Sequence, residues 1–141
     1  METSNLYYSD EYCDIGYNSM LGAVQSRWKG LFVSGERFRL ILDKLIELLG
    51  IKQSYFIIAD AREMKEIIPE DQQWIVNSWY PRAVRAGFKY EIIIVSKASY
   101  SELAIKDIVK NHYDDKLVKT VYLTDPESVN LWVGHFSGDV A

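Results

Sequence analysis

Several features that would point to a particular class of protein are scarce in this chain. It holds a single cysteine, Cys13, so no internal disulfide can form, which favours a reducing compartment. The two histidines, His112 and His135, make no ligand pair with Cys13 at helix or turn spacing, so we expect no metal site. No apolar run approaches the roughly 20 residues that cross a bilayer, so we expect no membrane span.

Motifs for nucleotide binding and nucleophilic catalysis are also absent. Gly30 and Gly35 are isolated, so nothing resembles a glycine-rich phosphate loop. No serine lies in a Gly-x-Ser-x-Gly elbow. Asp14 disfavours a reactive thiolate at Cys13, because a neighbouring carboxylate raises the pKa of a thiol. We therefore interpret Cys13 as a packed structural residue and expect neither a cofactor nor enzymatic activity.

Basic charge is in short supply as well. The chain has 20 acidic against 16 basic residues, a net charge of −4. Binding to a nucleic acid duplex requires a basic surface, so we expect no nucleic acid partner and attribute the negative charge to solubility. The first residues lack the basic and apolar regions of a signal peptide. We expect a cytoplasmic protein.

The 141 residues are 48% hydrophobic, enough for one domain with its own core. We expect a single domain over residues 1–141, with its core at about 5–134 and a frayed tail at 135–141.

A strand–helix–strand unit over residues 55–95 is the strongest pattern. Residues 55–60 and 90–95 are short apolar runs, and a helix-length segment at 71–86 separates them. Strands this apolar are buried on both faces. We therefore predict an α/β fold whose mixed sheet is parallel at its centre and flanked by about four helices.

Further strands are expected at both ends of this unit. Mixed and alternating β-formers at 5–8, 12–17 and 21–29 predict two or three antiparallel strands. Residues 118–123 predict the last strand.

The clearest helix begins at Ser34, an N-cap residue, and ends before Gly50, the expected C′ residue. In the 71–86 helix we expect a kink or a break at Pro81, which lacks a backbone donor. A capping box from Ser99 to Glu102 predicts a helix running to His112. The next helix starts at Asp125 and Pro126, with an apolar face formed by Val129, Trp132 and Val133.

The face of the 71–86 helix is less regular. An arc contains Ile75, Val76, Trp79, Ala83 and Ala86. Trp74 and Val84 fall off this arc, and Tyr80 lies beyond its edge. Trp74 and Tyr80 are therefore either exposed interface anchors or are buried by a rotation at the proline.

Charged side chains give two further candidates, each with a structural alternative. Asp60 and Arg62 follow a central strand at the sheet edge where α/β proteins bind ligands, or they only cap a loop and form a surface ion pair. A basic cluster at the end of the 71–86 helix either interacts favourably with the helix dipole or binds an anion or an acidic partner. It consists of Arg82, Arg85 and Lys89.

The dispersed motifs resemble the STAS family, whose name joins sulfate transporters and anti-sigma-factor antagonists. The closer likeness is to the SpoIIAA-like branch, often grouped with CRAL-TRIO lipid-binding domains. It covers about residues 12–136 and rests on Trp28-Lys-Gly30, Ser34-Gly-Glu-Arg-Phe38, Ile58-Ala-Asp-Ala-Arg62, Glu70-Asp-Gln-Gln-Trp74, Trp79-Tyr-Pro-Arg-Ala83, Gly87, Asp125-Pro-Glu127 and Asn130-Leu-Trp-Val133.

The resemblance implies a sheet flanked by helices and a non-enzymatic role in protein contact or small-ligand binding. In anti-sigma antagonists of this family, a serine near the start of the helix after the strand equivalent to the one at Asp60 is phosphorylated to switch partner binding. This chain has no serine or threonine from Tyr55 to Asn77, so it departs from that pattern.

Two functional hypotheses follow. The first is a regulatory interaction module that binds a protein partner or a second copy of itself as a homodimer, through a surface formed by Asp60, Arg62, Glu70, Asp71, Trp74, Tyr80, Arg82 and Arg85. The alternative is a carrier or sensor that binds a small apolar or lipid-like ligand between the sheet and the Trp-rich helix, in keeping with the 13% aromatic content.

Overall fold

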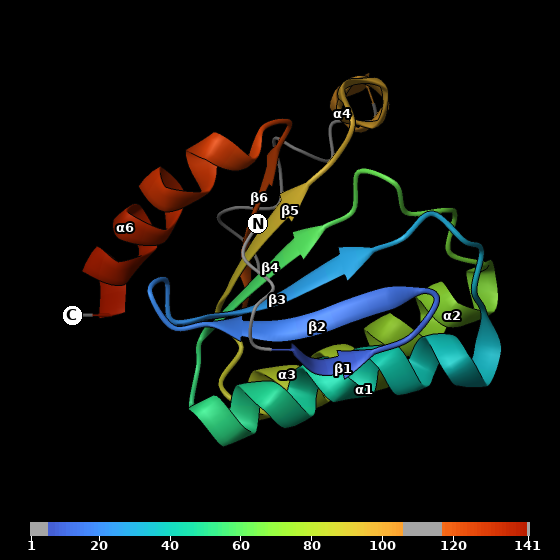
Figure 1. Cartoon of the computed structure of the whole chain (residues 1–141), viewed down its shortest axis with the longest axis horizontal. Coiled ribbons are helices and arrows are strands. Elements are labelled where there is room, and N and C mark those ends of the chain that lie inside the picture. The colour runs from blue at the N-terminus through green and yellow to red at the C-terminus, as the bar shows by residue number, and fades with distance from the viewer. Residues whose placement is uncertain (1–5, 106–116, 141) are drawn as a thin grey trace.

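One mixed sheet organises the chain (Figure 1). A computed structural model describes residues 6–105 and 117–140. Within these ranges the strands lie in the order β1-β2-β3-β4-β5-β6, so neighbours in the sheet are also neighbours in sequence. Their bounds are β1 (Leu6–Ser9), β2 (Cys13–Asn18), β3 (Ala23–Trp28), β4 (Phe56–Asp60), β5 (Tyr90–Ile94) and β6 (Lys119–Leu123).

The type of strand pairing changes once across the sheet, from antiparallel to parallel at β3. β1 and β2, and β2 and β3, pair antiparallel, whereas every pair from β3 to β6 is parallel. The predicted α/β class, the parallel centre and the N-terminal antiparallel strands are therefore confirmed.

Helices cover both faces of the sheet (Figure 1). When successive parallel strands are joined by connections of the same handedness, the connecting helices lie on the same face of the sheet. α1 and the α2–η1–α3 segment accordingly lie on one face. α6 covers the other face. The bounds are α1 (Gly35–Lys52), α2 (Pro69–Trp74), the π-helical turn η1 (Ile75–Trp79), α3 (Tyr80–Arg85), α4 (Lys97–Ile105), the 3₁₀ turn η2 (Pro126–Ser128) and α6 (Val129–Val140).

Two separate apolar clusters result, one on each face. The cluster under α1 and α3 contains Cys13, Ile15, Val24, Trp28, Phe38, Ile41, Leu42, Leu45, Leu48, Leu49, Ile57, Trp79, Ala83, Phe88 and Val118. The cluster under α6 contains Ala23, Phe56, Ile58, Tyr90, Ile92, Ile94, Val129, Val133 and Phe136. Along β4, Phe56 and Ile58 belong to the cluster under α6 and Ile57 to the cluster under α1, as expected for a strand buried on both faces.

The expectation of a frayed tail from 135 onward is wrong. α6 continues to Val140, and the side chain of Phe136 is 0% exposed. Its ring stacks on Tyr90 at 4.8 Å and lies 6.4 Å from Phe56, centroid to centroid. The apolar face expected at Val129 and Val133 therefore extends by one further turn onto the sheet.

The helix is not broken at Pro81, because the backbone stays helical from α2 through η1 into α3, and the irregularity is a π-helical turn just before the proline. The backbone N–H of Tyr80 donates to the carbonyl of Ile75, one residue further back than in an α-helix. The turn shifts the register of the helix face, so Val76, expected on the buried arc, is 66% exposed. Trp79 and Ala83 of the same arc are buried as expected.

Several predicted helix ends differ from those observed. The Ser34 side chain makes no capping hydrogen bond. Gly50 lies inside α1, which ends at Lys52 with Gln53 in the left-handed conformation. The helix after β5 begins at Lys97, and the Ser96 hydroxyl accepts from the Ser99 N–H. The expected extension of that helix to His112 lies outside the described residues.

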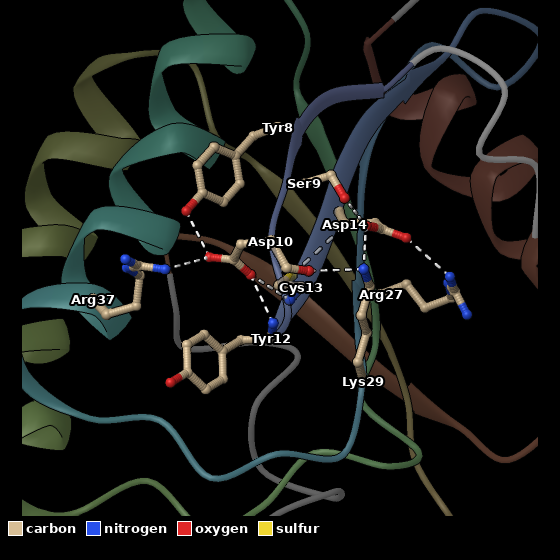
Figure 2. A network of polar contacts seen from close by, with 9 residues as sticks. All are labelled: Tyr8, Ser9, Asp10, Tyr12, Cys13, Asp14, Arg27, Lys29 and Arg37. Atoms are coloured by element: carbon tan, nitrogen blue, oxygen red, sulfur yellow. Dashed lines mark hydrogen bonds and ion pairs between the residues drawn. The ribbon is translucent and has the colours of Figure 1, made fainter.

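The polar network in Figure 2 fixes the turn between β1 and β2. The Asp10 carboxylate accepts from the backbone N–H groups of Tyr12 (2.7 Å) and Cys13 (2.8 Å) and from the Tyr8 hydroxyl (2.6 Å). Burial alone would raise the pKa of Asp10, but these hydrogen bonds and Arg37 hold it below its ordinary value. The edge of the sheet is thereby joined to α1, which carries Arg37.

Within residues 6–105 and 117–140, no helix is long and apolar enough to cross a membrane.

Replacing Phe136 with alanine should lower the free energy of unfolding by about 3–5 kcal/mol, because the ring is fully buried between sheet and helix. The matched control is Leu131→Ala on the same helix, where the side chain is 77% exposed and a loss below about 0.5 kcal/mol is expected. Urea denaturation followed by circular dichroism measures both. Equal, small losses would show that the end of α6 does not pack on the sheet.

Candidate functional site

Asp60 and Arg62 form a closed pair at the carboxyl end of β4. The guanidinium donates from Nη2 to Oδ2 at 2.7 Å and from Nε to Oδ1 at 2.9 Å. Burial opposes ionisation of Asp60, but Arg62 holds the pKa of this carboxyl below its ordinary value. Asp60 also accepts from the Arg62 backbone N–H at 3.3 Å. The geometry therefore matches the structural alternative, a loop cap joined to an ion pair.

Asp71 is buried and does not belong to a surface. Its carboxylate accepts from the Gly35 N–H at 2.9 Å and from Arg39 Nε at 3.2 Å. The first N–H of α1 is thus satisfied by a residue of α2. Asp71 ties the N-terminal ends of the two helices together.

Trp74 is partly buried between two arginines. The guanidinium carbon of Arg39 lies 5.4 Å from the indole centroid and that of Arg82 lies 5.5 Å from it. Arg82 also donates to Asp43 of α1 at 3.0 Å. Trp74 and Arg82 therefore hold α2 and α3 against α1.

The eight residues of the predicted partner surface do not form one surface. Asp60 pairs in register with Arg27 and Ile94 on the α6 face, whereas Trp74 packs on the α1 face. Glu70 and Arg85 are exposed. Tyr80 is partly buried, and its hydroxyl accepts from the Val118 N–H at 3.0 Å.

An apolar cavity of about 170 Å³ lies between the sheet and the helices α1 and η1; we call it the sheet–helix cavity. The described residues that line it are Ser26, Trp28, Phe38, Leu42, Leu45, Ile57, Ala59, Ala61, Met64, Ile67, Ile75, Trp79, Glu91 and Ile93. It lies between the sheet and the Trp-rich helix, where the carrier hypothesis places its pocket.

Small side chains on the sheet create this cavity. Ser26 on β3 is paired in register with Ala59 on β4, so two short side chains stand side by side beneath the helices. Trp79 of η1 is fixed above them, because its indole N–H donates to the Leu42 carbonyl at 2.7 Å. This contact joins η1 to α1, and the short side chains below leave part of the space between these helices and the sheet unfilled.

Among the described residues that line the cavity, the Ser26 hydroxyl is the buried polar group without a protein partner. Ser26 is 1% exposed, and its Oγ makes no hydrogen bond in the described structure. A buried hydroxyl in this state costs about 1–3 kcal/mol relative to a bonded one. A bound molecule with a polar atom above β3 would remove this cost.

A second cavity of about 270 Å³ adjoins the first at Ile75 and Glu91, which line both; we call it the β6 cavity. The described residues that line it are Ile75, Val76, Tyr80, Glu91, Val118, Thr120 and Tyr122. One part of its described lining is apolar, and the other part carries three hydroxyl groups and one carboxyl group.

Glu91 is the chemically distinctive residue of the two cavities. The Thr120 hydroxyl donates to its Oε1 at 3.3 Å, and no cation pairs with the carboxylate in the part of the chain that the structure describes. Burial raises the pKa of Glu91 to about 7, and the hydrogen bond from Thr120 lowers it only in part. Glu91 therefore changes charge near neutral pH.

Cys13 is the packed residue expected from the sequence. It is 0% exposed, and burial raises the pKa of its thiol to about 12. Among residues 6–105 and 117–140, no three His, Cys, Asp or Glu side chains gather in a way that could hold a metal ion.

Comparisons with protein-family models, with curated proteins and with solved structures found no match to this chain. The resemblance to the STAS family therefore stays a prediction.

Sequence reasoning missed Ser26, Ala59 and Glu91. A signal existed for Glu91, because it is the one charged residue inside the apolar run at 90–95. Ser26 interrupts the buried face that Val24 and Trp28 define at a period of two. Nothing in the sequence around Ala59 shows that the space between this residue and the helices above it is left unfilled.

The pKa of Glu91 predicts a pH-dependent stability. From its ordinary value of 4.5 up to about 7, the folded chain retains a proton that the unfolded chain releases, so the free energy of unfolding falls as pH rises. The full loss is at most about 3 kcal/mol. Glu91→Gln should remove this fall and exceed the unchanged protein in stability at about pH 8.

Urea titrations at steps of pH measure this effect. Glu70→Gln, at an exposed carboxyl on α2, controls for the loss of one charge. Other carboxyl groups do not interfere, because those with a lowered pKa stabilise the fold until the pH falls below their ordinary pKa, which is below the pH range of these titrations. These groups are Asp10, Asp14, Glu47, Asp60 and Asp125. A Glu91→Gln profile parallel to that of the unchanged protein would contradict the prediction.

Proposed function

We propose that the protein is a non-enzymatic binding module of the STAS type, a carrier or sensor that holds a small apolar molecule between its sheet and the Trp-rich helix. The observation that supports this most directly is the sheet–helix cavity, with its apolar walls and the unpartnered hydroxyl of Ser26. A concave apolar pocket with a few placed polar groups is the usual form of a small-molecule site.

The energetics favour an apolar occupant. Each methylene group moved from water into such a site contributes about 0.8 kcal/mol, or about fourfold in affinity. Trp28 and Trp79 line the cavity as rigid walls, and Trp79 is anchored to α1 through its indole N–H. Little conformational freedom is lost there on binding, because the walls are already in place.

The protein-interaction hypothesis has weaker support. Three residues of its expected surface are engaged internally: Asp71 with α1, Arg82 with Asp43 and Trp74 between two arginines. A side chain that already has its partners gains less from a new one than an exposed aromatic anchor does.

Filling the cavity should abolish binding. With 1-hexanol, 1-octanol and 1-decanol as probes, we expect saturable changes in tryptophan fluorescence and an affinity that rises up to fourfold per methylene. Ala59→Leu places a larger side chain on the cavity floor and should weaken 1-octanol at least about tenfold. Ala98→Leu, the same change at an exposed site on α4, should bind as the unchanged protein does.

Native mass spectrometry of the protein from its own host complements the titration. Extra mass of a few hundred daltons that organic solvent releases would identify a natural ligand. Fluorescence that stays flat across the alcohol series, or equal binding by Ala59→Leu and Ala98→Leu, would contradict the proposed function.

A further inference from the structure

The β6 cavity has a polar wall of one chemical kind. Among the described residues, its polar groups are the carboxyl of Glu91 and the hydroxyls of Tyr80, Thr120 and Tyr122. All of them offer oxygen acceptors, and no lysine or arginine lies among them. Such a wall attracts a hydrogen-bond donor with positive charge and disfavours an anion.

Glu91 has unused acceptor capacity. An ionised carboxylate offers about four lone-pair positions. Within the described residues Glu91 has a single hydrogen bond, from Thr120 at 3.3 Å. The group stands on the covered face of the sheet, in register between Ile57 and Thr120. A carboxylate in such surroundings is normally paired with a cation. Among residues 6–105 and 117–140 no cation pairs with Glu91, and this points to a ligand.

Two tyrosine rings add to this preference. Tyr80 and Tyr122 line the same cavity as Glu91. Tyrosine rings attract ammonium groups through their negatively polarised faces, and aromatic residues surround many bound cations in proteins. Burial raises the pKa of both phenols, that of Tyr122 to about 12, so both remain neutral near pH 7.

The shared wall joins the two cavities into one site with two chemistries. Glu91 and Ile75 line both, so a molecule whose apolar part contacts Ser26 and Ala59 has its other end directed toward Glu91. We infer that the ligand is an apolar amine, with its hydrocarbon part in the sheet–helix cavity and its ammonium group against the Glu91 carboxylate in the β6 cavity. This inference rests on the proposed function and names its ligand class.

Three probes that share one chain length test the inference at about pH 8, where Glu91 is ionised. Octylamine, 1-octanol and octanoate differ only in the head group. We expect octylamine to bind at least about tenfold more tightly than 1-octanol, because a charge-assisted hydrogen bond is about twice as strong as a neutral one. Octanoate should bind most weakly, because its carboxylate repels Glu91.

Two variants isolate the carboxylate. Glu91→Gln preserves shape and removes charge, so it should weaken octylamine about tenfold or more and leave 1-octanol unchanged. Glu70→Gln removes one charge at an exposed position and should change neither affinity. Circular dichroism confirms that both variants are folded at the temperature of the titration.

The outcomes separate the two proposals. Equal affinities for octylamine and 1-octanol, a Glu91→Gln variant that still prefers the amine, or octanoate as the tightest probe would each overturn the amine inference while the apolar cavity stands. Saturable binding by none of the three probes would overturn the proposed function and the inference together.

Discussion

The missing backbone N–H of Pro81 constrains the whole region above the sheet. A proline inside an α-helix removes one hydrogen bond, and its ring clashes with the carbonyl four residues earlier. The segment between β4 and β5 meets this constraint with the π-helical turn of η1, directly before α3. The turn brings Ile75 to the wall shared by the two cavities and leaves Val76 on the surface. Turns of this type are frequent at functional sites.

The cavities need this turn and the short side chains on the strands together. The short side chains of Ser26 and Ala59 form the floor of the sheet–helix cavity. Trp79, which is hydrogen-bonded to α1, covers it. The floor and its cover come from segments far apart in the sequence. Larger residues at the two floor positions would close the space, as in an ordinary core packed to full density. The protein thus forgoes packing energy at one place in its core, and it places a half-buried carboxyl beside the gap. Natural sequences break packing rules of this kind mainly at functional sites.

The sheet and the position of each helix could be predicted because hydrophobic periodicity is local information. The run at 90–95 and the apolar face of α1 are visible without knowledge of their neighbours. Helix ends were predicted less well, because their caps depend on distant residues: the N–H of Gly35 is satisfied by Asp71. Phe136 was missed because its partners lie on β4 and β5. The cavity could not be predicted, since it depends on a distance between elements rather than on any residue.

The separation of the core into two clusters has a consequence for how the protein unfolds. Trp28 and Trp79 belong to the cluster under α1, whereas Trp132 packs against the cluster under α6. Each half therefore carries its own intrinsic optical reporter. The sheet connects the halves. Non-coincident transitions of the two reporters would reveal an intermediate in which one side has melted and the other has not. Such a species would have an open sheet face while the cavities on the opposite face remained assembled.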